Sequence, residues 1–239
     1  MGFKSRKLVL LTTKTLHHDF FISTLSKKKK LDLFVIFEKR KLKPSFKVGD
    51  IDLKKQFLFE KKNFFKKKKF LMNCPHFTVS SINSIKCKKI LKRINPDLGI
   101  SFGTGKINPE IIKLFNKGII NIHRGIMTKY RGLDSEYWAS YHSDFKSIGT
   151  TIHYVNKHLD KGKTIFQKKL KIKSNYRAHM LRYFTTLIAA KNINNIVEKI
   201  FLNRLKLRAK QVHGRYYSFI PLSLKKIAYK KFNSYCQNK

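Results

Sequence analysis

Apolar and polar positions follow two periods along the first hundred residues. Short apolar runs rich in strand-forming residues occupy residues 7–13, 31–38 and 97–102, and each run is typical of a buried strand. Between the first two runs, apolar residues from Leu16 to Leu25 recur at near-helical spacing. A strand, a helix and a second strand in this order predict a βαβ unit with parallel strands and a right-handed crossover.

The same alternation continues through the second half of the chain. Further helices are predicted at 82–94, 109–115 and 178–205, and further strands at 119–123, 148–155 and 164–172. We therefore predict a single α/β domain with a Rossmann-like, doubly wound and mostly parallel sheet that has helices on both faces. Ligands of such sheets bind outside the carboxyl ends of the strands.

Two segments differ from this pattern. Residues 39–73 form a basic, variable insertion in the main domain, 1–205. They combine two lysine clusters, Lys61–Lys62 and Lys66–Lys69, with Phe57, Phe59, Phe64, Phe65 and Phe70. Lysine interleaved with aromatic residues is also found on surfaces that bind single-stranded nucleic acid. We prefer an amphipathic insertion whose phenylalanines pack inward and whose lysines are solvated. Residues 206–239 are predicted to be a basic C-terminal extension that packs on the domain.

Composition excludes several classes of protein. Of the 239 residues, 42% are apolar, which is enough to bury a core and excludes wholesale disorder. No apolar run has the length of a membrane-spanning helix, and the run Leu8–Leu11 is too short for a secretory signal. Cys74, Cys87 and Cys236 are spaced for neither a disulfide framework nor a zinc site. We expect a cytoplasmic protein that does not insert into membranes.

The net charge of +41 points first to a polyanionic partner. However, 44 of the 54 basic residues are lysine, whereas specific phosphate and base recognition relies on arginine. Lys, Asn, Phe, Ile and Tyr are abundant together, and all have A/T-rich codons. We interpret the charge mainly as the result of coding bias and expect no specific nucleic-acid partner.

The chemistry that the chain can perform is concentrated at predicted strand ends. Asn121 and His123 lie two apart in a strand and therefore share a side. An amide can donate to a developing oxyanion, and an imidazole can exchange a proton near neutral pH. Asp160 is the best candidate for the carboxylate that would complete the set. Taken singly, Asn and His at a strand end are more often turn formers, and Asp160-Lys-Gly162 alone would suit an ordinary hairpin turn.

Their order along the chain is more specific. Asn121-Ile-His123, Tyr130-Arg-Gly132, Thr151-Ile-His153 and Asp160-Lys-Gly162 follow one another in this order. This succession closely resembles the folate-dependent formyltransferase family, which includes glycinamide ribonucleotide, methionyl-tRNA and sugar N-formyltransferases. Together with the βαβ start, the resemblance extends through Gln167.

The resemblance implies a one-carbon group transferase. The donor would be 10-formyltetrahydrofolate, and the acceptor would be a primary amine of a small molecule. Asn121 and His123 would stabilise the oxyanion that forms when the amine attacks the formyl carbon, and Asp160 would help to move the amine proton. His153 would support this network, although a core histidine bonded to a backbone carbonyl is an equal alternative. The resemblance requires no metal and leaves a homodimer open.

By the same resemblance, two stretches would bind the pterin through backbone groups. They comprise Phe102, Gly103 and Thr104 after the third strand, and Val155, Asn156 and His158 in the loop before Asp160.

Departures from the family pattern bear on the acceptor. The loop Leu11–Leu16 has no glycine with which to cradle a substrate phosphate, which argues against glycinamide ribonucleotide. The chain after Ile172 is too short for the additional domain of the transfer-RNA enzymes. Nucleotide-linked amino sugars are therefore the preferred acceptors. The candidate contacts with the acceptor are Tyr130, Arg131, Trp138 and His153. The purine-pathway reaction, or a catalytically inactive basic protein that binds nucleic acid, remains the alternative.

Overall fold

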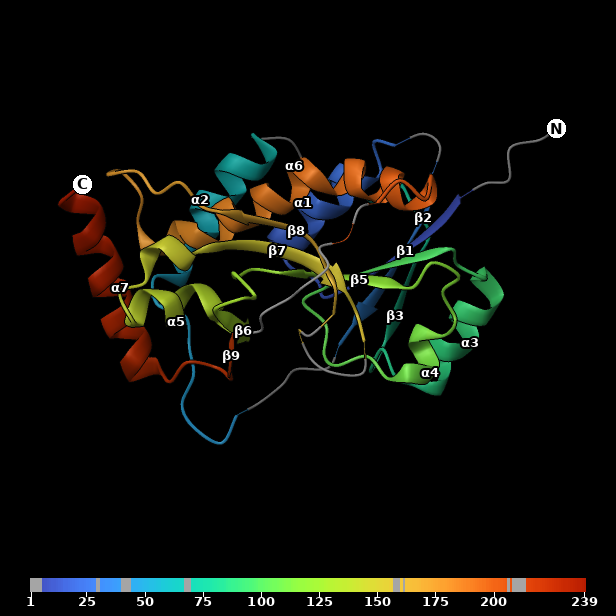
Figure 1. Ribbon diagram of the computed structural model, residues 1–239, viewed down its shortest axis with the longest axis horizontal. Coiled ribbons are helices and arrows are strands. Elements are labelled where there is room, and N and C mark those ends of the chain that lie inside the picture. The colour runs from blue at the N-terminus through green and yellow to red at the C-terminus, as the bar shows by residue number, and fades with distance from the viewer. Residues whose placement is uncertain are drawn as a thin grey trace.

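A seven-stranded sheet forms the centre of the molecule (Figure 1). The computed structural model describes residues 6–28, 31–39, 44–66, 70–156, 160, 162–205, 207 and 214–239. In order across the sheet, the strands are β3 (His76–Val79), β2 (Leu31–Glu38), β1 (Arg6–Thr12), β4 (Leu98–Phe102), β5 (Ile119–His123), β7 (Gly149–Tyr154) and β8 (Thr164–Lys169). The first five are parallel, whereas β7 and β8 run antiparallel to their neighbours. The predicted fold class, a mostly parallel α/β sheet, is confirmed.

Helices cover both faces of the sheet (Figure 1). Side chains alternate along β1, so that Leu8 and Leu10 join the core beneath α1 (Leu16–Leu25) and α6 (Leu181–Phe201). Val9 and Leu11 face the opposite core, beneath α3 (Ile85–Ile94) and α4 (Pro109–Ile112). A central strand buried on both sides must be apolar throughout, which is why this run lacks the alternation of a surface strand.

The basic insertion contains a helix that packs on the domain. This helix is α2 (Leu53–Phe65), and it buries Phe64 and leaves Phe57 46% exposed. Glu60 on the same helix is fully buried and receives two hydrogen bonds of 2.7 Å from Arg182 of α6. The insertion is therefore attached by a buried ion pair as well as by phenylalanine packing. Lys67–Lys69 of the second lysine cluster lie outside the described residues.

The C-terminal part of the chain contributes to a third core. Strand β9 (Arg215–Tyr217) pairs in parallel with β6 (Tyr130–Gly132) in a separate two-stranded sheet. Helix α7 (Leu222–Gln237) packs beside α5 (Ser135–Tyr141), and this core contains Phe232 and Ala139. Short 3₁₀ turns at Phe145–Ser147 and Ala178–Met180 complete the secondary structure.

The sequence analysis did not predict α2, β3, β6, α5, β9 or α7. Strand β3 is an edge strand in which only Val79 is buried, so its sequence shows no apolar run. Helix α7 buries Ala228, Phe232 and Cys236 four residues apart, but the lysines between them obscure the pattern.

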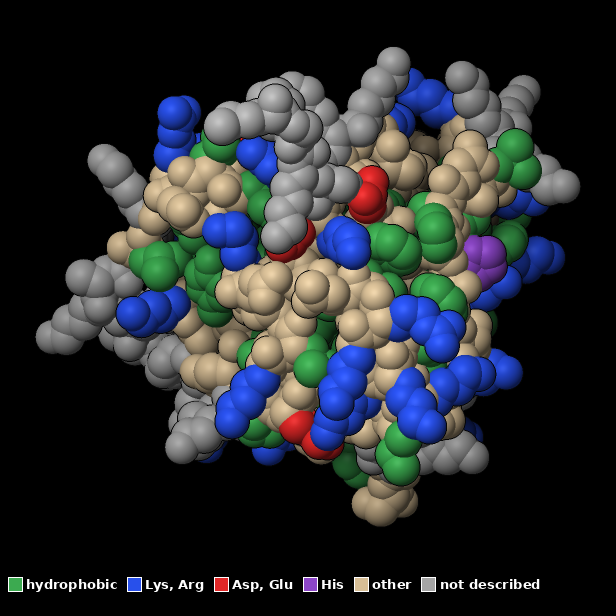
Figure 2. All heavy atoms as spheres, turned by 90° about the vertical axis from the view of Figure 1, so that its right-hand side faces the viewer, with side chains coloured by type: hydrophobic (Ala, Val, Ile, Leu, Met, Phe, Trp, Pro, Cys, Tyr) green, Lys and Arg blue, Asp and Glu red, His purple; other side chains and the backbone are tan. Residues whose placement is uncertain are grey.

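The positive charge is spread over the surface. Figure 2 shows Lys and Arg side chains across the face that lies on the right of Figure 1, with few acidic side chains among them. Helix α3 contributes exposed Lys86, Lys89, Lys92 and Arg93. In the described part of the chain, no helix is long and apolar enough to cross a membrane.

Candidate active site

A cavity of about 360 Å³ opens at the carboxyl ends of the parallel strands. Strand β1 has β2 on one side and β4 on the other, so the chain reverses its direction of travel across the sheet here. Ligands of doubly wound sheets bind at such a reversal. The described residues that line the cavity are Thr13, Thr15, His17, His18, Ser101–Ile107, Asn121–Arg124, Gly132–Glu136, His153, Val155, Asn156, Asp160 and Tyr216.

Asn121, His153 and Asp160 meet on one wall of this cavity. Asn121 in β5 lies directly opposite His153 in the antiparallel strand β7, which brings the two side chains together. The amide nitrogen of Asn121 lies 3.2 Å from Nε2 of His153 and donates to Oδ1 of Asp160 at 3.3 Å. His153 Nδ1 donates to the carbonyl of Tyr154 at 2.8 Å. His153 therefore has both the backbone bond of a core histidine and a place in the polar network.

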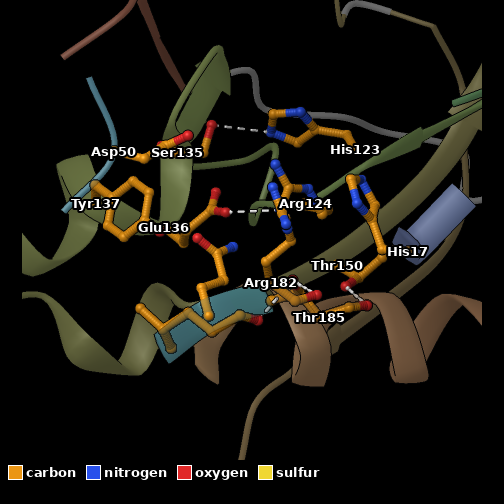
Figure 3. A network of polar contacts seen from close by, with 12 residues as sticks. His17, Asp50, His123, Arg124, Ser135, Glu136, Tyr137, Thr150, Arg182 and Thr185 are labelled. Carbon is orange, nitrogen blue, oxygen red and sulfur yellow. Dashed lines mark hydrogen bonds and ion pairs between the residues drawn. The ribbon is translucent and has the colours of Figure 1, made fainter. Parts of the chain in front are cut away.

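His123 lies between two groups that accept hydrogen bonds. Its Nε2 donates to the carbonyl of Tyr130 at 2.8 Å, and the hydroxyl of Ser135 lies 3.3 Å from the same nitrogen (Figure 3). Its Nδ1 faces Oδ2 of Asp160 at 3.6 Å, which is longer than a hydrogen bond. Nε2 is therefore engaged with the backbone, and Nδ1 is the ring nitrogen that faces Asp160.

Asp160 is the negative centre of the site. Its carboxylate is about 10% exposed, and Oδ2 accepts from the backbone N–H of Gly132 at 2.8 Å. Burial alone would raise the pKa of this carboxyl. The charge of His123, the hydrogen bond and charge of His153 and the Gly132 N–H outweigh burial and hold the pKa well below its usual range. Asp160 is therefore ionised throughout the neutral range.

Close packing at two glycines positions these groups. A side chain at Gly125 would place its Cβ 2.5 Å from Nε2 of His123. Gly132 has a φ of +90°, and its Cβ would lie 2.0 Å from the carbonyl oxygen of Tyr217 in β9. Strand β6 thus ends in glycine because the carbonyl of Tyr217 in the paired strand β9 leaves no room for a side chain at residue 132.

Two histidines on the cavity wall were missed by the sequence analysis. His17 and His18 begin α1, immediately after β1, and are 5% and 3% exposed. Burial, followed by the charge of Arg124, lowers the pKa of His18 to about 3. The pKa of His17 is also lowered, chiefly by burial and by His18. The signal that could have identified them is their position in the turn after the first strand, at the carboxyl edge of the sheet.

The described residues predicted to hold the pterin all line the cavity. Phe102, Gly103 and Thr104 form its edge after β4, and Val155 and Asn156 follow β7. His158 lies outside the described residues.

Of the four residues predicted to contact the acceptor, His153 lines this cavity, whereas Tyr130, Arg131 and Trp138 do not. Tyr130 stacks on Tyr217 with ring centroids 5.5 Å apart. Arg131 Nε donates to the carbonyl of Gly214 at 2.6 Å, and Trp138 donates to the carbonyl of Ser218 at 2.9 Å. All three therefore hold the C-terminal segment against the site.

The described residues include no group of three His, Cys, Asp or Glu side chains arranged to hold a metal ion.

Comparison with known proteins gives one family and several solved folds. Residues 34–190 match the family model described as formyl transferase. The methionyl-tRNA formyltransferase of Borreliella burgdorferi is 31% identical over 132 residues, which cover 55% of this chain and 42% of that protein. The chain thus spans less than half the length of the curated relatives that it matches.

Two solved structures show the same fold. One is a formyltransferase from Anoxybacillus kamchatkensis in complex with UDP-4,6-dideoxy-4-formamido-L-AltNAc and tetrahydrofolate. It is 20% identical, with a TM-score of 0.53, over 89% of this chain and 85% of that one. The other is the phosphoribosylglycinamide formyltransferase of Anaplasma phagocytophilum. It is 18% identical, with a TM-score of 0.60, over 90% of this chain and 99% of that one.

Proposed function

We propose a reaction for this chain from one premise: it belongs to the formyl transferase family, whose model matches well over half of its residues. The reaction is the transfer of a formyl group from 10-formyltetrahydrofolate to a primary amine of a small acceptor. The observation that carries the proposal is the meeting of Asn121, His123 and Asp160 on one wall of a cavity at the sheet's carboxyl edge.

Each of these side chains has a task that its contacts allow. In this proposal, the amide of Asn121 and the imidazole of His123 donate hydrogen bonds to the negative charge that develops on the formyl oxygen. The acceptor nitrogen forms a bond to the formyl carbon while the bond from that carbon to the folate nitrogen breaks. The acceptor amine loses one proton, and the folate nitrogen gains one. Asp160, held ionised by His123 and His153, accepts a hydrogen bond from the amine, or from a water that relays the proton to the folate nitrogen, and so stabilises the positive charge of the transfer.

The cavity wall suits a folate donor. Backbone segments at Phe102–Gly105 and Val155–Asn156 both border the cavity, where main-chain groups can bond a flat heterocycle. Nε2 of His18 is buried on this wall without a hydrogen-bond partner in the described part of the chain. When bound, the donor supplies an activated formyl carbon. The chain itself supplies the donors and the base.

For the acceptor, we propose a nucleotide-linked amino sugar. The Anoxybacillus kamchatkensis neighbour was solved with a UDP-linked formamido sugar and tetrahydrofolate, which supports this class of acceptor. The turn between β1 and α1 has no glycine, and His17 and His18 in the first turn of α1 are kept neutral by burial. A phosphate cradle needs donor groups and close backbone approach, so this turn argues against glycinamide ribonucleotide.

Calorimetric titration with 5-formyltetrahydrofolate, a stable stand-in for the donor, tests the proposal at 150 mM salt. Micromolar binding, followed by formyl transfer to at least one amine in a panel of nucleotide-linked amino sugars, would support it. No folate binding would contradict it and would favour a basic protein that has kept the fold without the reaction.

A further inference from the structure

Arg124 is a charged side chain on the cavity wall, immediately after His123. It lies in the turn that follows β5, and its side chain is 24% exposed. Figure 3 shows its guanidinium directed at Glu136, which is 2% exposed. Arg124 therefore faces the same cavity as the groups proposed to carry the reaction.

The guanidinium of Arg124 is paired but not saturated. Its Nη1 lies 3.1 Å from Oε1 of Glu136, yet this buried nitrogen makes no hydrogen bond of acceptable geometry. In the part of the chain that the structure describes, no other hydrogen bond uses this side chain. Guanidinium carries five N–H donors, and leaving such donors unused in a buried place is costly.

Arg182 provides the comparison within the same network. It donates to both carboxylate oxygens of Glu60 at 2.7 Å, through Nε and Nη2. This fork satisfies Arg182 and fastens α2 to α6. Arg124 has a similar buried carboxylate beside it but lacks the fork, and its side chain lines the cavity.

The neighbours of Arg124 fit a role in binding. His17 and His18 are neutral, because burial and nearby positive charge lower the pKa of each. Neither histidine therefore competes with Arg124 for an anion. Glu136 holds the guanidinium in place through a single ion pair, which a bidentate ligand could partly replace.

We propose that Arg124 binds an oxyanion of the acceptor, a carboxylate or a phosphate, and so selects amines that carry an acidic group. This inference rests on the proposed function and names a feature of its substrate. Arg131, which was predicted to fork to a phosphate, is instead bonded to the backbone of Gly214. Among the residues that the structure describes, Arg124 is the one arginine that lines the cavity.

The test titrates the full chain with inorganic phosphate and, separately, with sodium acetate, at constant ionic strength. The parent protein should show saturable binding of at least one anion, and Arg124→Gln should weaken it by roughly ten- to a hundredfold. Glu136→Gln should tighten it severalfold, because it removes the carboxylate that competes for the guanidinium. The phosphate and acetate arms distinguish a phosphorylated acceptor from a carboxylate acceptor.

Two further variants make the test specific. Arg93→Gln removes one exposed charge from α3 and should leave anion binding unchanged. The double variant Arg124→Gln/Glu136→Gln removes the whole ion pair, so that no unpaired buried charge endangers folding, and should also lose anion binding. Absence of saturable binding in the parent, equal losses in the Arg124 and Arg93 variants, or weaker binding in Glu136→Gln would overturn the inference.

Folate binding separates this inference from the proposed function. 5-Formyltetrahydrofolate should bind the parent and Arg124→Gln alike. Loss of folate binding in that variant alone would assign Arg124 to the donor and overturn its role toward the acceptor. Absence of folate binding in the parent would instead count against the proposed function.

Discussion

The backbone N–H of Gly132 donates to Oδ2 of Asp160 at 2.8 Å, while the side chains of Asn121 and His153 lie against Oδ1. A main-chain donor cannot rotate away from its acceptor as a side chain can. The orientation of the carboxylate is therefore set by strand β6, and β6 is held in turn by its pairing with β9.

Replacing Asp160 by asparagine should abolish most of the proposed activity without unfolding the chain. The amide keeps the shape of the side chain but lacks the negative charge that stabilises the proton transfer. We expect turnover to fall by roughly 10²- to 10⁴-fold, the range of a general acid–base group, with folate affinity nearly unchanged. Glu110→Gln, which alters an exposed carboxylate on α4, is the matched control. Turnover near that of the parent in Asp160→Asn would contradict the assignment.

His123→Ala should remove one donor to the developing oxyanion. By comparison with other oxyanion donors, the rate should fall by about 10²- to 10³-fold. Steady-state kinetics should place this loss in kcat more than in KM, because the interaction strengthens as charge develops. A change confined to KM would show that His123 only binds substrate.

Gly132→Ala should disturb the site from the backbone. The added Cβ would meet the carbonyl oxygen of Tyr217 at 2.0 Å, at a φ of +90° that alanine disfavours. We expect a loss of about 2–4 kcal/mol in the free energy of unfolding, measured by urea denaturation. Gly49→Ala is the control, since its Cβ would make only an ordinary 3.6 Å contact with Leu222. Equal stability of the two variants would show that β9 does not confine Gly132.

The two histidines of the β1–α1 turn should make the protein sensitive to acid. The pKa of His18 is lowered to about 3 in the folded chain, against an ordinary value of 6.5, so below pH 6.5 the unfolded chain binds the proton first. The contribution of each such histidine to the free energy of unfolding is therefore fully present above pH 6.5. Below pH 6.5 the free energy of unfolding falls by about 1.4 kcal/mol per pH unit for each such histidine.

Denaturant titrations between pH 4 and 6.5 measure this slope. His17→Asn/His18→Asn should flatten it. Asp160 makes a separate contribution, because its folded pKa lies below the ordinary 3.8; that stability is present above 3.8 and is lost only at lower pH. An unchanged slope in the double variant would place the acid-sensitive groups elsewhere.

The attachment of the insertion to the domain should depend on Glu60 and not on the lysines of the insertion. Glu60→Ala leaves the guanidinium of Arg182 buried without its partner, and breaking such a pair costs about 3–5 kcal/mol in the free energy of unfolding. Lys61→Ala, at the next and exposed position, should change stability little. Chemical denaturation of both variants checks this. Similar stabilities would mean that α2 is attached by its phenylalanines alone.

The sequence was most informative where burial is nearly complete. The run 31–38 was predicted as a strand, and β2 has the same limits; 119–123 and β5 also coincide. In both runs the apolar pattern reflects one dominant effect, the burial of apolar side chains in the core. The spacing within Asn121-Ile-His123 then placed two side chains on one side of a strand, because strand geometry is local.

What the sequence could not show depends on packing between distant segments. His17 and His18 look like any histidines at the start of a helix until β4 and β5 are placed beside them. Arg131 donates to the carbonyl of Gly214, whereas Arg124 pairs with Glu136 and lines the cavity. Such distinctions arise from tertiary contacts, which a pattern of single residues does not record.

The pairing of β6 with β9 has a consequence for the order of synthesis. All seven strands of the main sheet, with the donors of β5 and with Asp160, are synthesised before the ribosome reaches Arg215–Tyr217. Until those last residues emerge, Gly132 lacks the strand that confines it, and the carboxylate lacks a fixed orientation. A nascent chain can thus contain the whole seven-stranded sheet before the proposed active site has its final geometry.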